Sequence, residues 1–344
     1  MQRKGYLKFF IISLAALTLT AVSFLSQATA APVVLKFAGQ NPPEHFATTS
    51  MRAIAKEVEQ KTNGRVQIRV FPANQLGDYS LVYEELIRGT IEMAAISFPS
   101  QFDSRMDMIY IHGYTASYKQ VAKAYDPNGW FFKMMDQFNG KLGVKLLGMY
   151  LEGMVGMGTV KEIKEPLNPN VDHGVLLRIP NMDVFKTALE GAKFRTISIP
   201  FADVYQSMQT GVCDGDTGYS IVAAYTALGD VIKHWYNYNK NTECLGIMIS
   251  NKVWDKLSKE DRQVLQAAVN KQTALSIKNA EANDKKYLDL MTKRGIKVHT
   301  YTPEQLRPMM KAFSNTWEKL DDSKGKALMS DFKNEMKKIT DGSK

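Results

Sequence analysis

Cysteine and histidine are scarce in this sequence. Its 344 residues include 2 cysteines and 5 histidines, so a disulfide-dense scaffold is excluded. The histidines show no metal-ligand spacing, since they stand at positions 45, 112, 173, 234 and 299. The sequence therefore predicts no metal site and no cofactor.

The motifs of common enzymes are also missing. There is no Gly-x-Ser-x-Gly elbow, no His-Glu-x-x-His pair and no phosphate-binding loop. Asp214 and Asp216 begin like a calcium loop, but Tyr219 and Tyr225 occupy the positions where that loop needs glycine and glutamate. The run "GMVGMG" has its glycines in the wrong order for a dinucleotide site and indicates a hinge or a close backbone approach. Nothing here indicates an enzyme.

Long apolar runs are confined to the N-terminus. Arg3, Lys4 and Lys8 precede the apolar stretch Phe9–Leu25, and small residues follow at 28–30. This order is typical of a secretory signal peptide, with cleavage expected near Ala30 and a periplasmic mature protein. A membrane anchor is the alternative, but the apolar run is shorter than the roughly 20 residues that a span needs.

Charge gives little indication of a macromolecular partner. The formal net charge is +9, and removing the three basic residues of the leader leaves +6. Lysine and arginine are spread along the chain with no aromatic-basic module, so we expect no nucleic-acid partner. Whether the protein is a monomer or a dimer stays open.

Cys213 and Cys244 are the only cysteines. In an oxidising compartment, an even pair is either one disulfide or two buried thiols. Both cysteines lie beside expected strands that could be neighbours, so the disulfide is favoured.

Strands and helices alternate in the first part of the mature chain. Strand patterns at 33–37, 64–72 and 89–98 alternate with helical patterns at 47–62 and through Tyr83 to Ile87. Such alternation predicts an α/β fold with a mostly parallel sheet and a ligand crevice beyond the carboxyl ends of the strands. The loops that start at Gly39, Gln75 and Ser97 should then face one site.

The alternation restarts further along the chain. Strand patterns at 145–160, 173–180 and 194–200 alternate with helical patterns at 183–189 and 201–211, and a long helix is expected at 254–293. We expect two lobes joined by crossing strands, with the long helix bridging both. Lobe I would comprise 31–152 with 244–283 returning to it. Lobe II would comprise 153–243, with the helical tail 284–344 packing on it.

Several ordered segments carry a family resemblance. The segments "LKFAGQNPPEHF", "EVEQKTNGRVQIRVFPANQLGD", "LIRGTIEMA" and "GVLLRIPNMDVFKTALEGAKFRTISIPFADVYQSMQTGVCDG" resemble the periplasmic solute receptors of tripartite ATP-independent (TRAP) transporters, from about Val33 to Leu257. The resemblance implies a two-lobed α/β fold that closes on a small organic acid and delivers it to membrane permease subunits. It also implies that the arginine of "RIPN", Arg178, pairs bidentately with the ligand carboxylate.

Physical chemistry supports that role for Arg178. A carboxylate offers two coplanar oxygens, and a guanidinium offers a matching fork of donors, so arginine suits a site that fixes orientation. The alternative is an arginine paired with a surface acid.

The sequence departs from the family pattern near the expected pocket. Members that bind sugar acids often carry a second arginine where this chain has Glu152, Met154 and Met157. Family members also often have an asparagine shortly after the "DG" pair, where this chain has Asp216, Thr217, Gly218 and Tyr219. These changes predict a monocarboxylate ligand with an apolar or aromatic body. The alternative ligand is a C4-dicarboxylate or a sugar acid. The alternative function is that of a secreted enzyme or a ligand-sensing module on the same fold.

The candidate ligand contacts share a place on the loops and strand ends that should face the crevice. Core packing is the alternative for the aromatic and methionine side chains among them. The candidates are Arg178, Tyr219, Phe201, Phe98, Ser97, His45, Tyr79, Met154, Glu152 and Thr217.

Overall fold

The computed structural model describes residues 31–114 and 117–341. The expected signal peptide lies outside these residues. One compact unit comprises the chain from Val34 onward. Among the described residues, no helix combines the length and apolarity that crossing a membrane requires.

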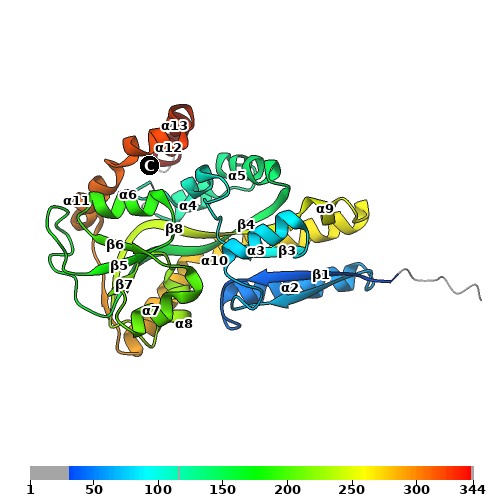
Figure 1. Cartoon of the computed structure of the whole chain (residues 1–344), viewed down its shortest axis with the longest axis horizontal. Coiled ribbons are helices and arrows are strands. Elements are labelled where there is room, and N and C mark those ends of the chain that lie inside the picture. The colour runs from blue at the N-terminus through cyan, green and yellow to red at the C-terminus, as the bar shows by residue number, and fades with distance from the viewer. Residues whose placement is uncertain (1–30, 115–116, 342–344) are drawn as a thin grey trace, which may run out of the picture. The chain divides into compact units, whose positions relative to one another are not determined.

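The strands form one mixed sheet. Its order is β2-β1-β3-β8-β4-β7-β5-β6, and β9 pairs with β8 (Figure 1). The strands are β1 Val33–Gly39, β2 Val66–Phe71, β3 Met93–Ile96, β4 Val144–Thr159, β5 Leu176–Ile179, β6 Arg195–Ser198, β7 Gly215–Asp216, β8 His234–Ser250 and β9 Lys297–His299.

The pairing directions correct the prediction of a mostly parallel sheet. β1 runs parallel to β3, and β5 runs parallel to β6 and β7. However, β8 is antiparallel to both β3 and β4, and β4 is antiparallel to β7. The local strand-helix alternation correctly indicated the parallel pairs, but the long strands return through the middle of the sheet in the opposite direction.

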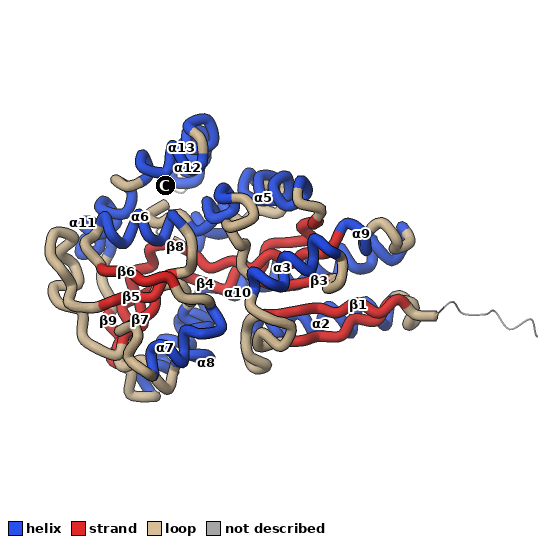
Figure 2. The backbone as a smooth tube through the Cα atoms, viewed as in Figure 1, coloured by secondary structure: helices blue, strands red, loops and turns tan. Residues whose placement is uncertain are grey.

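Helices cover the faces of the sheet (Figure 2). They include short 3₁₀ segments, labelled η. Their bounds are α2 Phe46–Lys61, α3 Tyr79–Arg88, η1 Ser104–Tyr110, α4 Tyr118–Ala124, α5 Trp130–Lys141, α6 Asp183–Gly191, η2 Phe201–Asp203, α7 Val204–Gln209, α8 Ile221–Leu228, α9 Asn251–Trp254, α10 Lys259–Lys293, α11 Pro303–Ser314, η3 Trp317–Leu320, α12 Asp321–Lys324 and α13 Lys326–Asp341.

Side-chain caps explain where the two best-defined helices of the second half begin. Ser258 accepts a hydrogen bond from the amide of Asp261 and so caps α10. Thr302 and Gln305 form a reciprocal capping box at the start of α11. These caps satisfy amide groups that the first turn of a helix leaves without a partner.

Two long strands and one long helix connect the parts of the sheet. β4 has 16 residues and β8 has 17, and they pair along most of their lengths. α10 has 35 residues, about 50 Å of helix, and it packs against α2, β4, α8 and β9. It therefore contacts both the part of the sheet near β1 and the part near β9.

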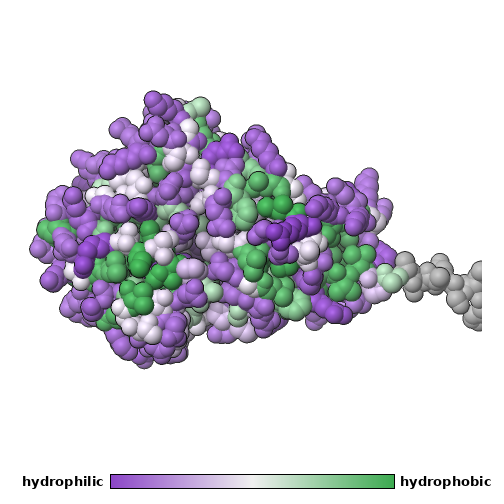
Figure 3. All heavy atoms as spheres, viewed as in Figure 1, coloured by the Kyte–Doolittle hydropathy of each residue, from purple (hydrophilic) through white to green (hydrophobic). Residues whose placement is uncertain are grey.

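The core has two hydrophobic clusters of buried side chains. One lies beneath α2 and α10, and the larger one extends along β4 and β8 to α6, α8 and the C-terminal helices. Polar side chains cover most of the face seen in Figure 3, with smaller apolar groups between them.

The C-terminal tail packs on more than one part of the chain. α11 contacts α6, whereas α12 contacts η1 and α13 contacts α4. Lys324 on α12 forms a buried ion pair of 2.8 Å with Asp107 on η1. The tail is thus anchored by a charge pair as well as by apolar packing.

Candidate functional site

Arg178 lies in the middle of β5 and is almost fully buried. Its side chain is 1% exposed, its Nε donates to the carbonyl of Ile199 at 2.8 Å, and its Nη1 donates to Asp216 Oδ1 at 3.1 Å. It is therefore paired with an internal acid rather than with a surface one. Register places Arg178 beside both Ile197 on β6 and Asp216 on β7, which fixes the root of the side chain.

The acid that holds Arg178 is itself held by backbone groups. Asp216 Oδ2 accepts hydrogen bonds from the amides of Gly218 at 2.8 Å and Tyr219 at 3.1 Å. A Cβ atom at Gly218 would lie 2.6 Å from Arg178 Nη1, so only glycine lets the guanidinium lie this close to the backbone. The guanidinium is thus fixed in orientation before any ligand arrives.

A cavity adjoins the guanidinium. It is small, with about 20 Å³ of room for water-sized molecules, and aromatic rings supply much of its wall. Its lining residues are Tyr79, Ser97, Tyr110, Arg178, Pro180, Met182, Phe185, Phe201, Gly218 and Glu243.

Four of the residues expected from the sequence line this cavity. They are Arg178, Ser97, Tyr79 and Phe201. Tyr219 lies behind Phe201, because the two rings stack with centroids 4.4 Å apart and the Tyr219 hydroxyl donates to the carbonyl of Phe201 at 3.1 Å. Tyr219 therefore supports the cavity wall rather than forming it.

Three other expected contacts have structural partners outside the cavity lining. Phe98 is fully buried, and its ring packs over Gly246. The amide of Met154 donates to Asp284 at 2.8 Å. The Thr217 hydroxyl donates to the carbonyl of Gly156 at 3.1 Å.

His45 and Glu152 form a separate buried polar group near the cavity. His45 Nδ1 accepts a hydrogen bond from the amide of Ala47, and its Nε2 lies 3.9 Å from Glu152 Oε1. Glu152 also accepts hydrogen bonds from Asn41 and, at 3.2 Å, from Ser220. Burial raises the pKa of Glu152 to about 7 and lowers that of His45 to about 3, so the imidazole is neutral.

Sequence reasoning missed Glu243, the acidic residue of the cavity. It lies on β8 opposite Gly153 of β4, and its carboxylate accepts a 2.7 Å hydrogen bond from the Ser97 hydroxyl. Burial, and next the nearby charge of Glu152, raise the pKa of Glu243 well above its usual range. The available signal was a charged residue at the edge of the apolar run 244–249.

The other missed residues are aromatic or apolar. Tyr110 donates to the carbonyl of Cys244 at 2.9 Å and accepts from the amide of Phe98 at 2.9 Å, which fixes its ring in the wall. Met182 and Phe185 lie just after Arg178 in the chain and add apolar surface. They belong to the same segment of the sequence as Arg178, but their spacing alone does not distinguish them from core residues.

Comparison with known proteins identifies the family of the chain. Residues 37–342 match the model of the family described as bacterial extracellular solute-binding protein, family 7. The chain belongs to this family. It is therefore a periplasmic solute-binding protein of the TRAP type and not an enzyme.

Individual relatives match this chain along nearly its whole length. The sialic acid-binding periplasmic protein of Vibrio cholerae is 24% identical, covering 93% of this chain and 97% of that protein. The C4-dicarboxylate-binding periplasmic protein of the same organism is 26% identical, and the match covers 92% of this chain and 95% of that protein. The structure of the sugar acid binding protein of Advenella mimigardefordensis, solved with galactonate, superposes with a TM-score of 0.82 and is 17% identical in sequence. The match covers 90% of this chain and 99% of that one. These matches confirm the predicted two-lobed α/β fold with crossing strands and a bridging helix.

The predicted disulfide of this solute-binding protein is wrong. Cys213 and Cys244 are both buried free thiols. Cys213 precedes β7, which pairs with Thr159, whereas Cys244 pairs with Leu151. Those two positions on β4 are eight residues apart (159 − 151), roughly 25 Å of strand, while a disulfide needs Cα atoms within about 7 Å.

Proposed function

We propose that this solute-binding protein binds a small monocarboxylate in the cavity at Arg178, by closure of the cleft, and delivers it to the permease subunits of a TRAP transporter. Export with cleavage near Ala30 belongs to the same proposal. The observation that carries it is a buried, pre-oriented guanidinium at a cavity. A periplasmic receptor needs such a group because it must hold an anion that is otherwise well hydrated.

The hydrogen bonds of Arg178 leave one edge of its fork for a ligand. Nε and Nη1 have protein acceptors, whereas no residue within 31–114 or 117–341 accepts from Nη2. A carboxylate that approaches this edge meets donors already aimed at it. The loss of side-chain entropy on binding is then small.

The acidic side chains favour a ligand with one carboxylate. Glu243 lines the same cavity as Arg178, and Glu152 is electrostatically linked to Glu243. A second carboxylate would find no cation at that end of the cavity, because Glu243 and not a second arginine lies there, and burying a charge without a partner is costly. A hydroxyl or amine at that end of the ligand would instead donate to the Glu243 carboxyl group. Tyr79, Phe201 and Phe185 offer flat apolar surface to the part between.

The named ligands of the relatives span several kinds of organic acid. Of the three proteins compared above, one is named for binding sialic acid, one for binding C4-dicarboxylates, and one was solved with galactonate. They share a carboxylate and differ in the rest of the molecule. Glu243 and the aromatic wall of the cavity, rather than any one relative, therefore support a monocarboxylate as the ligand.

Calorimetry with a matched panel tests this proposal. The mature protein would be titrated with aryl-acetates with and without a hydroxyl or amine, with galactonate, and with succinate. We expect an aryl monocarboxylate that carries a donor to bind most tightly, and the ligand to be recovered unchanged. Tightest binding of succinate would overturn the monocarboxylate class, and turnover of the ligand would overturn the receptor function.

A further inference from the structure

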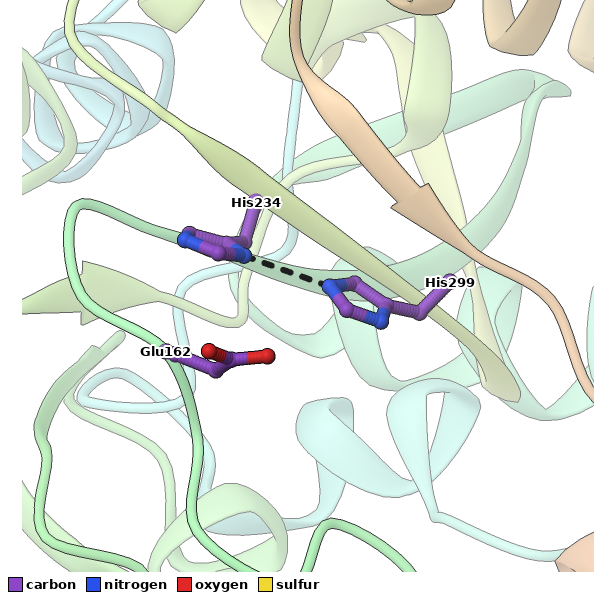
Figure 4. Close-up of side chains that lie close together, drawn as sticks. All are labelled: Glu162, His234 and His299. Atoms are coloured by element: carbon purple, nitrogen blue, oxygen red, sulfur yellow. Dashed lines mark hydrogen bonds between the residues drawn. The ribbon is translucent and has the colours of Figure 1, made fainter.

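Two histidines and a glutamate meet at the edge of the sheet where β9 pairs with β8. His234 is the first residue of β8, His299 is the last residue of β9, and Glu162 follows β4 (Figure 4). One ligand atom from each of the three lies within 4.8 Å of the others. None of them lines the cavity at Arg178.

The two imidazoles are already spaced for a shared ion. His234 Nδ1 and His299 Nε2 are 3.2 Å apart. Two nitrogens bound to one tetrahedral Zn²⁺ at about 2.0–2.1 Å are roughly 3.3 Å from each other. A common ion that replaces the proton between them therefore fits this nitrogen–nitrogen distance, once each ring turns so that its lone pair points at the ion.

Neighbouring groups hold the imidazoles in place. The ring of His299 stacks on Tyr236 with centroids 4.2 Å apart and an interplanar angle of 2°. β8 and β9 pair in parallel, with Tyr236 beside His299 and His234 beside Lys297. Partial burial lowers the pKa of both histidines, and neutral imidazole is the form that binds metal.

One cation competes for the glutamate. Lys297 Nζ donates to Glu162 Oε1 at 3.2 Å, and both side chains are 62% exposed. Ion pairs this exposed contribute little because water screens them and long side chains lose entropy. Lys297 can therefore swing into solvent and leave the carboxylate to a divalent ion.

We propose that Glu162, His234 and His299 form a surface site for a divalent transition-metal ion such as Zn²⁺, with a fourth position left to water. Two imidazole nitrogens and one carboxylate suit Zn²⁺, Ni²⁺ or Cu²⁺ and do not suit Ca²⁺ or Mg²⁺, which prefer oxygen ligands. Spacing along the sequence gives no signal for this site because strand pairing, not one local segment, brings the ligands together.

Zinc titration of the mature, tag-free chain tests the site. We expect one saturable Zn²⁺ per chain, with binding weakened by about tenfold or more in His234→Ala and in His299→Ala. Glu162→Gln should weaken it less, and Glu165→Gln, an exposed glutamate in the same connection, should leave it unchanged. Melting temperatures of the metal-free variants show whether each remains folded.

A second measurement identifies the ligands directly. In proton NMR spectra, substoichiometric Zn²⁺ should shift the imidazole signals of His234 and His299 and leave those of His45, His112 and His173 in place. Absence of saturable binding, or wild-type affinity in both histidine variants, would overturn the proposal. Binding of organic acids should be the same with and without Zn²⁺, so the result is independent of the site at Arg178.

Discussion

The carboxylate of Asp284 on α10 accepts a 2.8 Å hydrogen bond from the amide of Met154 on β4. The preceding residue, Gly153, has φ +141°, and a Cβ atom there would lie 2.3 Å from Asp284 Oδ1. The pairing of β4 with β8 shifts register between Leu151 and Gly153. The long helix is therefore joined to the crossing strand at an irregular point of the sheet, directly opposite Glu243.

Gly153→Ala should destabilise the protein strongly. The new methyl group would meet a buried carboxylate in a backbone conformation that only glycine adopts easily, so we expect a loss of about 2–4 kcal/mol in the free energy of unfolding. Denaturant unfolding measures this. Gly140→Ala is the control, because no atom lies within 4 Å of a Cβ there, and its stability should be unchanged or slightly higher. Equal stability of the two variants would contradict the close approach.

Asp284 should make stability depend on pH. Burial raises its pKa from 3.8 to about 7, so the folded state holds a proton that the unfolded state has released. The stabilisation is complete below pH 3.8 and is lost as the pH rises through about 7, a change on the order of 4 kcal/mol. Asp284→Asn removes this titration, so its unfolding free energy should fall less steeply between pH 4 and pH 7.

Urea unfolding at several pH values provides that comparison. Asp289→Asn is the matched control, because Asp289 is an exposed acid on the same helix. Its pH profile should follow that of the wild type. If the Asp284→Asn profile also follows the wild type, the carboxyl group does not titrate as its burial implies.

Arg178→Ala should weaken ligand binding by on the order of 10²- to 10³-fold, because a ligand carboxylate would be buried without its partner. Arg178→Lys should restore part of the affinity, since a single ammonium replaces the charge but not the fork. The removal also leaves Asp216 buried with backbone donors only, so the melting temperature must be measured beside the calorimetry. Normal affinity in a folded Arg178→Ala protein would show that the carboxylate lies elsewhere.

Thiol titration should find two free cysteines per chain in denaturant without reductant, and none in the native protein. Cys213 and Cys244 are 1% and 0% exposed, and burial raises the pKa of both thiols. A cysteine-free control, Cys213→Ser with Cys244→Ala, sets the background. A denatured chain without reactive thiols would show that the two positions do come together.

Local patterns along the sequence predicted much of the fold but little of β8. The helix expected at 47–62 is α2 at Phe46–Lys61, and the strand expected at 145–160 is β4 at Val144–Thr159. In β8, polar residues at 240–243 are buried together with apolar ones, because both faces of the strand are covered. The alternation that marks a half-buried strand is therefore absent, and Glu243 could not be placed.

The candidate site was only partly predictable from the sequence. Arg178 was predicted because the family resemblance gave the arginine of "RIPN" a role and because a guanidinium matches the two oxygens of a carboxylate. Tyr219 was expected to contact the ligand, but its ring stacks on Phe201 and lies behind the cavity wall. Which of two adjacent rings faces a cavity depends on side-chain directions that spacing does not determine.

The central place of β8 has a consequence for how the chain assembles. β3 ends at Ile96 and β4 at Thr159, yet both pair with β8, which ends at Ser250. Neither strand gains this neighbour until about 250 residues have emerged from a ribosome or a membrane channel. Contacts this distant along a chain form slowly. Until β8 arrives, the edges of β3 and β4 lack this partner strand, and their backbone amide and carbonyl groups stay open to other polypeptides.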